Sequence, residues 1–191
     1  MILFNKKAFT LIEITIVMSL ISLLLLLVYI PFSYQLNVVS TKNGANKLNQ
    51  MINETKFLAY GGYVNKNGKN SNIGLYLEKG INKNKIFIVS YPYETTLNDM
   101  KDPYEIKNLN NNANGEIVRE DFLDKNISVT NFPGSNNDKI MLMFKTVSGQ
   151  LSILEKTGAG FTELSSSGLT ITVGFKGMTD GNLSKIFFIS K

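Results

Sequence analysis

Three amino acids are missing from this chain of 191 residues, which has no cysteine, no histidine and no tryptophan. Without histidine and cysteine there is no imidazole to move protons, no thiol nucleophile, no thiolate zinc site and no disulfide. The sequence also lacks a phosphate-binding glycine loop, a dinucleotide-binding fingerprint, a nucleophile elbow and any zinc-ligand spacing. We therefore expect that the protein is not an enzyme.

Charged residues are sparse as well, at 18% of the chain, with a formal net charge of +5. The surplus lysines are scattered over many polar segments rather than gathered in one run. A small, dispersed positive charge is typical of a solvated surface, so a nucleic-acid partner is not indicated.

The apolar residues are concentrated near the N-terminus, in an almost unbroken run over Ile14–Phe32. As a helix this run spans roughly 28 Å, close to the hydrocarbon thickness of a bilayer. Lys6 and Lys7 precede it and the next basic residue is Lys42, which predicts a cytoplasmic N-terminus and an external C-terminal part. An ordinary secretory signal would need a small-x-small cleavage site after the run, and Ile30–Gln35 offers none.

One carboxylate, Glu13, stands at the start of this apolar helix. A charged side chain in the middle of a membrane costs about 2.5–3.5 kcal/mol on insertion scales. The cost is smaller at a helix N-terminus, where the helix dipole favours negative charge. Glu13 is therefore either a tolerated interfacial acid or a group whose partner lies on another chain.

The segment Lys6–Glu13 (KKAFTLIE), followed by the membrane helix, resembles the prepilin processing motif of type IV pilins and type II secretion pseudopilins. The resemblance implies cleavage by a prepilin peptidase between Ala8 and Phe9, N-methylation of Phe9, and use of Glu13 as the assembly carboxylate. The cut would create an amine four residues from Glu13. The amine of one subunit could then pair with Glu13 of its neighbour and favour the correct axial register.

Three positions depart from the family pattern. Ala8 stands where the family usually has glycine at the cleavage site, which keeps a small residue but predicts slower cutting. Pro31 lies one residue later than the usual helix-interrupting proline, and Ser22 replaces a common mid-helix glycine. These departures bear on the packing of the filament core rather than on the resemblance.

The helix is expected to kink at Pro31 and to continue beyond it. From Ala45 onward, apolar residues recur at steps of three and four, which predicts an amphipathic helix that ends at Gly61 and Gly62. We expect four segments: a leader over 1–8, a transmembrane and assembly helix over 9–32, its amphipathic continuation over 33–62, and an extracytoplasmic head domain over 63–191.

The head is expected to be rich in strands, because short β-branched and aromatic runs alternate with Asn, Gly and Lys. The predicted strands are Ile73–Glu78, Lys85–Tyr91, Ile127–Phe132, Lys139–Lys145, Gln150–Leu154, Leu169–Phe175 and Lys185–Ser190. This order is similar to that of H-type pseudopilins and FimT-like minor pilins. The expected fold class is α+β: a pilin-like long helix packed on an antiparallel sheet.

An asparagine-rich stretch imitates an EF-hand calcium loop, with Asn110, Asn112 and Asn114 at the first ligand positions and Asp121 at the twelfth. Only one of these ligands is a carboxylate, so binding would be weak, and a plain loop is the alternative. No other metal or cofactor is expected. The nearby acidic cluster of Glu116, Glu120, Asp121 and Asp124 is interpreted as a solvated turn.

The leading hypothesis is a minor pilin or pseudopilin of a type IV pilus or type II secretion-like filament. The resemblance implies four kinds of partner: a prepilin peptidase, other pilins or pseudopilins, an inner-membrane assembly platform and membrane lipid. Two alternatives remain open, a filament-tip adhesin or DNA-uptake receptor subunit and a membrane-anchored external domain that never assembles. The protein is expected to be located first in the inner or cytoplasmic membrane, as a single-pass protein. After assembly it would be located in a pilus or pseudopilus.

Overall fold

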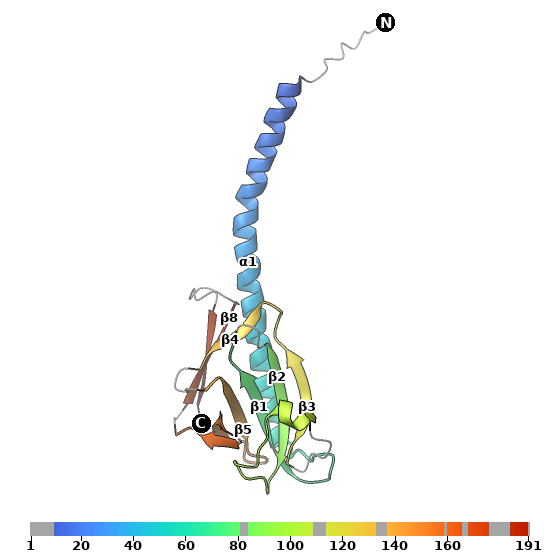
Figure 1. Cartoon of the computed structure of the whole chain (residues 1–191), viewed down its shortest axis with the longest axis vertical. Helices are drawn as coiled ribbons and strands as arrows, with labels where there is room; N and C mark the ends of the chain where they lie inside the picture. The colour runs from blue at the N-terminus through green and yellow to red at the C-terminus, as the bar shows by residue number, and fades with distance from the viewer. Residues whose placement is uncertain are drawn as a thin grey trace. The chain divides into compact units, whose positions relative to one another are not determined.

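The computed structural model describes residues 10–80, 84–108, 114–132, 137–158, 160–165, 168–175 and 184–190. A long helix, α1 (Leu11–Tyr60), comes first, and a short helix, α2 (Pro103–Asn108), lies later in the chain (Figure 1). The strands are β1 (Ser71–Glu78), β2 (Lys85–Pro92), β3 (Glu116–Phe122), β4 (Ile127–Asn131), β5 (Lys139–Phe144), β6 (Leu151–Thr157), β7 (Gly160–Glu163), β8 (Gly168–Phe175) and β9 (Ser184–Ser190). The chain divides into two compact units, one up to Val38 and one from Val39 onward.

The second unit contains two antiparallel sheets. The larger sheet has the strand order β3-β2-β1-β5-β6-β7, and the smaller has the order β4-β8-β9. In the larger sheet Leu75 of β1 lies opposite Ile88 of β2 on one side and Leu142 of β5 on the other. All seven predicted strands are present, and the predicted α+β fold with an antiparallel sheet is confirmed.

One face of the larger sheet packs against the stretch of α1 that belongs to the second unit. Leu48, Met51, Ile52 and Ala59 of the helix are buried in one cluster with alternate residues of the central strands, which include Leu75, Leu77, Ile86, Ile88, Ile140 and Leu142. The helical spacing of three and four and the strand spacing of two therefore meet in a common core. The predicted amphipathic continuation of the helix is thus a core element of this unit.

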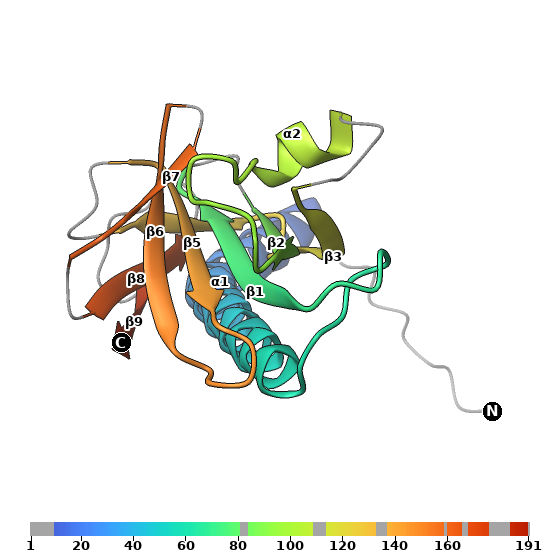
Figure 2. The same cartoon turned by 90° about the horizontal axis from the view of Figure 1, so that it is seen from below.

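The opposite face of the sheet is covered as well, by the segment that leads into α2 (Figure 2). Met100 of this segment and Ile106 of α2 itself are buried in one cluster with Tyr76, Phe87 and other strand residues that point away from α1. Burial on both faces explains why β1 and β2 are almost continuously apolar rather than alternating.

Two strands and one helix were not predicted from the sequence: β3, β7 and α2. The interpretation of the acidic cluster as a turn is wrong for three of its four members, because Glu116, Glu120 and Asp121 lie in β3. Each of the three pairs with lysine or arginine, and only Asp124 lies beyond the strand. The charges mark an edge strand, a position where charged side chains discourage pairing with another sheet.

Ion pairs fasten this edge strand to α1. Arg119 of β3 donates to both carboxylate oxygens of Glu54 on the helix, at 2.9 and 2.8 Å, and to Asp121 at 2.7 Å. Lys47, two turns earlier on α1, pairs with Asp121 at 2.5 Å. The contact between the helix and the edge strand is therefore stabilised by a connected network of four charges rather than by isolated pairs.

Candidate assembly site at the N-terminal helix

The first turn of α1 is closed by a reciprocal pair of hydrogen bonds between Thr10 and Glu13. The backbone N–H of Thr10 donates to Glu13 Oε2 at 2.8 Å, and the backbone N–H of Glu13 donates to Thr10 Oγ1 at 3.3 Å. This is a capping box, in which two backbone donors of the first turn are satisfied by side chains. Its signature, a threonine followed three residues later by a glutamate, is present in the sequence.

The capping box fixes the position of the Glu13 carboxylate at the positive end of the helix dipole. The Thr10 hydroxyl also donates to Glu13, at 2.8 Å, and both Thr10 donors bond the same oxygen, Oε2. The second carboxylate oxygen, Oε1, takes part in neither bond. Oε1 can therefore accept a hydrogen bond from a further donor while Oε2 keeps the carboxylate at the helix N-terminus.

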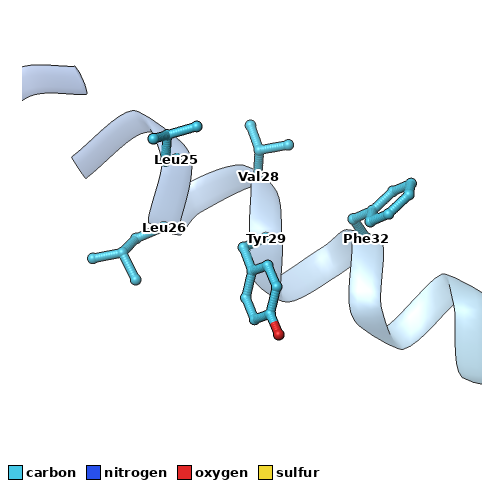
Figure 3. A pocket seen from close by; sticks show the side chains of 5 residues that line it. All are labelled: Leu25, Leu26, Val28, Tyr29 and Phe32. Atoms are coloured by element: carbon cyan, nitrogen blue, oxygen red, sulfur yellow. The ribbon is translucent and has the colours of Figure 1, made fainter. Parts of the chain in front are cut away.

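Beyond this turn the first unit exposes apolar side chains on every side of the helix. Leu25, Leu26, Val28, Tyr29 and Phe32 border a shallow hollow on the helix surface, and their side chains point outward from this single element (Figure 3). Within the described residues α1 is the one helix long and apolar enough to cross a membrane. Such an all-round apolar surface fits lipid or other apolar helices as its surroundings.

The serine and threonine side chains in this apolar stretch bond to the helix itself. Ser19 Oγ donates to the carbonyl of Ile16 at 2.8 Å, and Ser22 Oγ to that of Met18 at 2.8 Å. Their donors are therefore satisfied without water, as a membrane requires. Ser22, the residue that replaces the family's usual glycine, thus brings no unpaired donor into the span.

Pro31 lies inside α1, which continues through it to Tyr60 as one helix, so the proline does not end the helix. The kink predicted at Pro31 stays a prediction. The basic residues Lys6 and Lys7 and the predicted cleavage-site residues Ala8 and Phe9 lie outside the described residues. Their roles rest on the sequence motif.

The calcium hypothesis also falls partly outside the described residues, because Asn110 and Asn112 are not among them. Asn114 lies in a turn before β3, and Asp121 lies near the end of that strand. Burial acts to raise the pKa of Asp121, but hydrogen bonds from Lys47, the Phe122 N–H and Arg119 outweigh it and hold the pKa below its usual value. A calcium ion would have to compete with these cations for the single carboxylate of the proposed loop.

No group of three or more Asp, Glu, His or Cys side chains is arranged to hold a metal ion among the residues that the structure describes. Calcium binding by the loop remains a prediction that rests on the spacing of its asparagines.

Comparison with known proteins bears on the same N-terminal stretch. Residues 3–29 match the family model described as the prokaryotic N-terminal methylation motif. No curated protein and no solved structure matches the chain. The matched residues include both sides of the predicted cleavage site, the capping box and most of the apolar helix. The chain therefore carries, at its N-terminus, the prepilin-type motif of type IV pilins and pseudopilins.

Proposed function

We propose that this chain is a structural subunit, a minor pilin or pseudopilin, of a type IV pilus or type II secretion-like filament. The observation that carries the proposal is the methylation motif over residues 3–29, which runs directly into an exposed apolar helix. A helix of this kind needs either lipid or neighbouring helices around it, and a filament subunit uses both in turn.

In the proposed sequence of events, a prepilin peptidase cuts between Ala8 and Phe9, and the new N-terminus at Phe9 is methylated. The subunit then waits in the membrane with its head outside. Assembly on an inner-membrane platform moves the apolar helix from lipid into contact with the helices of other pilins or pseudopilins.

Glu13 has a defined role in these proposed steps. Its carboxylate is held at the helix N-terminus by Thr10, with Oε1 left outside the capping bonds. The N-terminal amine of a neighbouring subunit can donate to it there. A pair of opposite charges in apolar surroundings is costly to leave unmatched, so this contact selects the axial register more than it adds stability.

The test is the mass of the protein and of its N-terminal peptide, after purification from membranes that contain a prepilin peptidase. A chain that begins at methylated Phe9 is the expected result. A chain that retains Met1 would support the plain anchored domain instead. A chain that begins after residue 35 would mean that the apolar run is a secretory signal.

A further inference from the structure

Three Asn-x-Ser/Thr triplets occur in the sequence, beginning at Asn53, Asn126 and Asn182. This triplet is the acceptor pattern for N-linked glycosylation, in which the asparagine carries the sugar and the hydroxyl residue completes the pattern. A chain rich in asparagine contains such triplets by chance, so only their surroundings can show which of them is able to act. The structure describes the first two, and Asn182 lies outside the described residues.

The triplet at Asn53 lies inside α1 and is poorly suited to accept a sugar. Thr55, its hydroxyl residue, is buried and donates to the carbonyl of Met51 at 2.6 Å. In a helix, moreover, residues two apart do not face each other, so one enzyme site cannot contact both side chains. A helix depends on contacts that are local in sequence and forms within microseconds, which leaves little time before the triplet is hidden.

The triplet at Asn126 lies in the turn that leads into β4, and Asn126 itself is exposed. Asp124 holds this turn, because its carbonyl accepts the N–H of Ile127 at 2.8 Å and its carboxylate accepts the N–H of Asn126 at 3.4 Å. The side-chain amide of Asn126 makes no hydrogen bond with the described part of the chain. A sugar on this nitrogen would therefore break no contact of the fold and would project into solvent.

The hydroxyl residue of this triplet, Ser128, becomes buried only through a distant strand. It lies in β4 opposite Gly174 of β8 and is 1% exposed in the folded head. In the chain β8 follows only after β5, β6 and β7, so β4 has no partner strand until all of them have been exported. Until then the segment can stay extended, with Asn126 and Ser128 on the same side of the backbone.

We propose that Asn126 is the acceptor of an N-linked glycan, which is added outside the cytoplasm before β4 pairs with β8. The donor is an oligosaccharide joined through pyrophosphate to a membrane lipid. Nδ2 of Asn126 bonds to C1 of the first sugar, and the bond between C1 and the pyrophosphate oxygen breaks. One amide proton passes to a base of the transferase, and the lipid pyrophosphate leaves. The inference rests on the external position that the proposed function gives to the head.

A carboxylate also distinguishes this triplet from the one in α1. Asp124 stands two residues before Asn126, whereas Met51 stands at the same distance before Asn53. In the folded head Asp124 accepts from the hydroxyl of Ser40 at 3.3 Å. In the extended segment its charge is free to pair with a cationic group of the transferase, and such charge-assisted hydrogen bonds are among the stronger ones.

The first experiment is peptide mass spectrometry of the full-length chain, purified from the membranes of its native host and digested with trypsin. Cleavage after lysine leaves the two triplets on separate peptides, 48–56 and 126–139. The expected result is an added mass of whole sugar residues on the peptide that contains Asn126, and none on 48–56. Asn126→Gln and Ser128→Ala should each lose this mass, Asp124→Asn should lower its occupancy severalfold, and the matched control Asn53→Gln should keep it.

An unmodified peptide over Asn126 would overturn the proposal, and so would sugar on Asn53 instead. Full occupancy in Ser128→Ala would mean that the triplet is not recognised, and full occupancy in Asp124→Asn would overturn the role of the carboxylate. Unchanged thermal melts of the variants show that a lost glycan is not caused by misfolding.

The same digest tests the filament function separately through the N-terminal peptide. Methylated Phe9 together with a bare Asn126 would overturn the glycan alone. A glycosylated Asn126 on a chain that retains Met1 would support the glycan and overturn the filament function.

A second experiment tests the order of events. The folded full-length chain, made without a transferase, and a synthetic peptide over residues 121–131 are each incubated with a bacterial oligosaccharyltransferase and lipid-linked oligosaccharide extracted from the host. The peptide should be modified at least about tenfold faster, because its Ser128 is accessible. Equal rates would overturn transfer before folding, and an unmodified peptide would overturn Asn126 as an acceptor.

Discussion

The N–H of Val147 donates to the carbonyl of Ala59, and this bond ties the β5–β6 hairpin to the last turn of α1. Its donor residue has φ of 70°, although valine is disfavoured there. We expect Val147→Asn to raise the free energy of unfolding by about 1 kcal/mol, because asparagine tolerates the left-handed conformation. Thermal melts of the full-length chain in detergent measure this.

The matched control is Val147→Thr, which is nearly the same size and keeps the branched Cβ. It retains the backbone strain and should leave the melting temperature unchanged. Equal stabilisation by both variants would show that loss of apolar exposure, not relief of strain, is the cause.

Two buried tyrosines on the same face of the sheet differ in one hydrogen bond. The hydroxyl of Tyr91 donates to the carbonyl of Lys101, whereas the buried hydroxyl of Tyr76 has no partner among the described residues. Tyr91→Phe leaves a carbonyl unpaired and should cost about 1–2 kcal/mol of unfolding free energy. Tyr76→Phe removes an unpaired group and should be neutral or stabilising. A similar loss from both variants in denaturant melts would mean that the Tyr76 hydroxyl has a partner, such as a buried water.

Asp121 links stability to pH. Its pKa is held below the usual value despite burial, chiefly through the Lys47, Phe122 and Arg119 hydrogen bonds. A lowered native pKa stabilises the fold above the unfolded pKa and loses that contribution as pH falls through the native pKa. We therefore expect Asp121→Asn to cost about 1–2 kcal/mol at neutral pH, and the gap from wild type to close below about pH 4.

The control for this prediction is Glu94→Gln. Glu94 pairs with Lys69 at 3.1 Å, but both side chains are largely exposed, so the pair should contribute little. Unfolding free energies from denaturant melts at several pH values distinguish the two. A constant gap between Asp121→Asn and wild type down to pH 3 would contradict the assignment of the ionised carboxylate as the stabilising form.

The sequence predicted the motif and most strands because both depend on local patterns. The segment over Lys6–Glu13 has a specific sequence pattern. The strands β2 and β8 are rich in β-branched and aromatic residues, and β1 and β5 are short apolar runs. β3 was missed because Arg119, Glu120 and Asp121 interrupt its apolar pattern. Those charges suit an edge strand that faces lysines, but the strand order that makes β3 an edge is a long-range property.

Two helix starts carry capping-box signatures that can be recognised in the sequence. Thr10 and Glu13 open α1, and Asp102 and Glu105 open α2 by the same reciprocal bonds, with Pro103 at the first helical position.

The proposed cleavage site between Ala8 and Phe9 yields a prediction about the rate of processing. Ala8 has one methyl group more than the glycine usual in the family, so we expect Ala8→Gly to be processed faster than the natural chain. Ala8→Leu, which no longer has a small residue at this position, should remain uncut. Pulse-labelling followed by gel mobility or N-terminal mass measures both. Equal processing of all three chains would mean that this position is not recognised by the peptidase.

Glu13 has two separable roles, as a helix cap and as a proposed partner for the amine of a neighbouring subunit. Thr10→Ala removes the side chain that bonds Glu13 but keeps the carboxylate, and should cost about 1 kcal/mol of helix stability. Glu13→Gln keeps a side-chain oxygen to accept from Thr10 but removes the charge. If pairing with the amine drives assembly, Glu13→Gln should be processed and inserted normally yet lose incorporation into filaments, whereas Thr10→Ala should incorporate nearly as well as the natural chain.

If both variants failed equally, the cap itself would be the requirement. If Glu13→Gln incorporated fully, the carboxylate would have no role in assembly, because a neutral amide cannot replace a charge that selects the register through its unmatched cost.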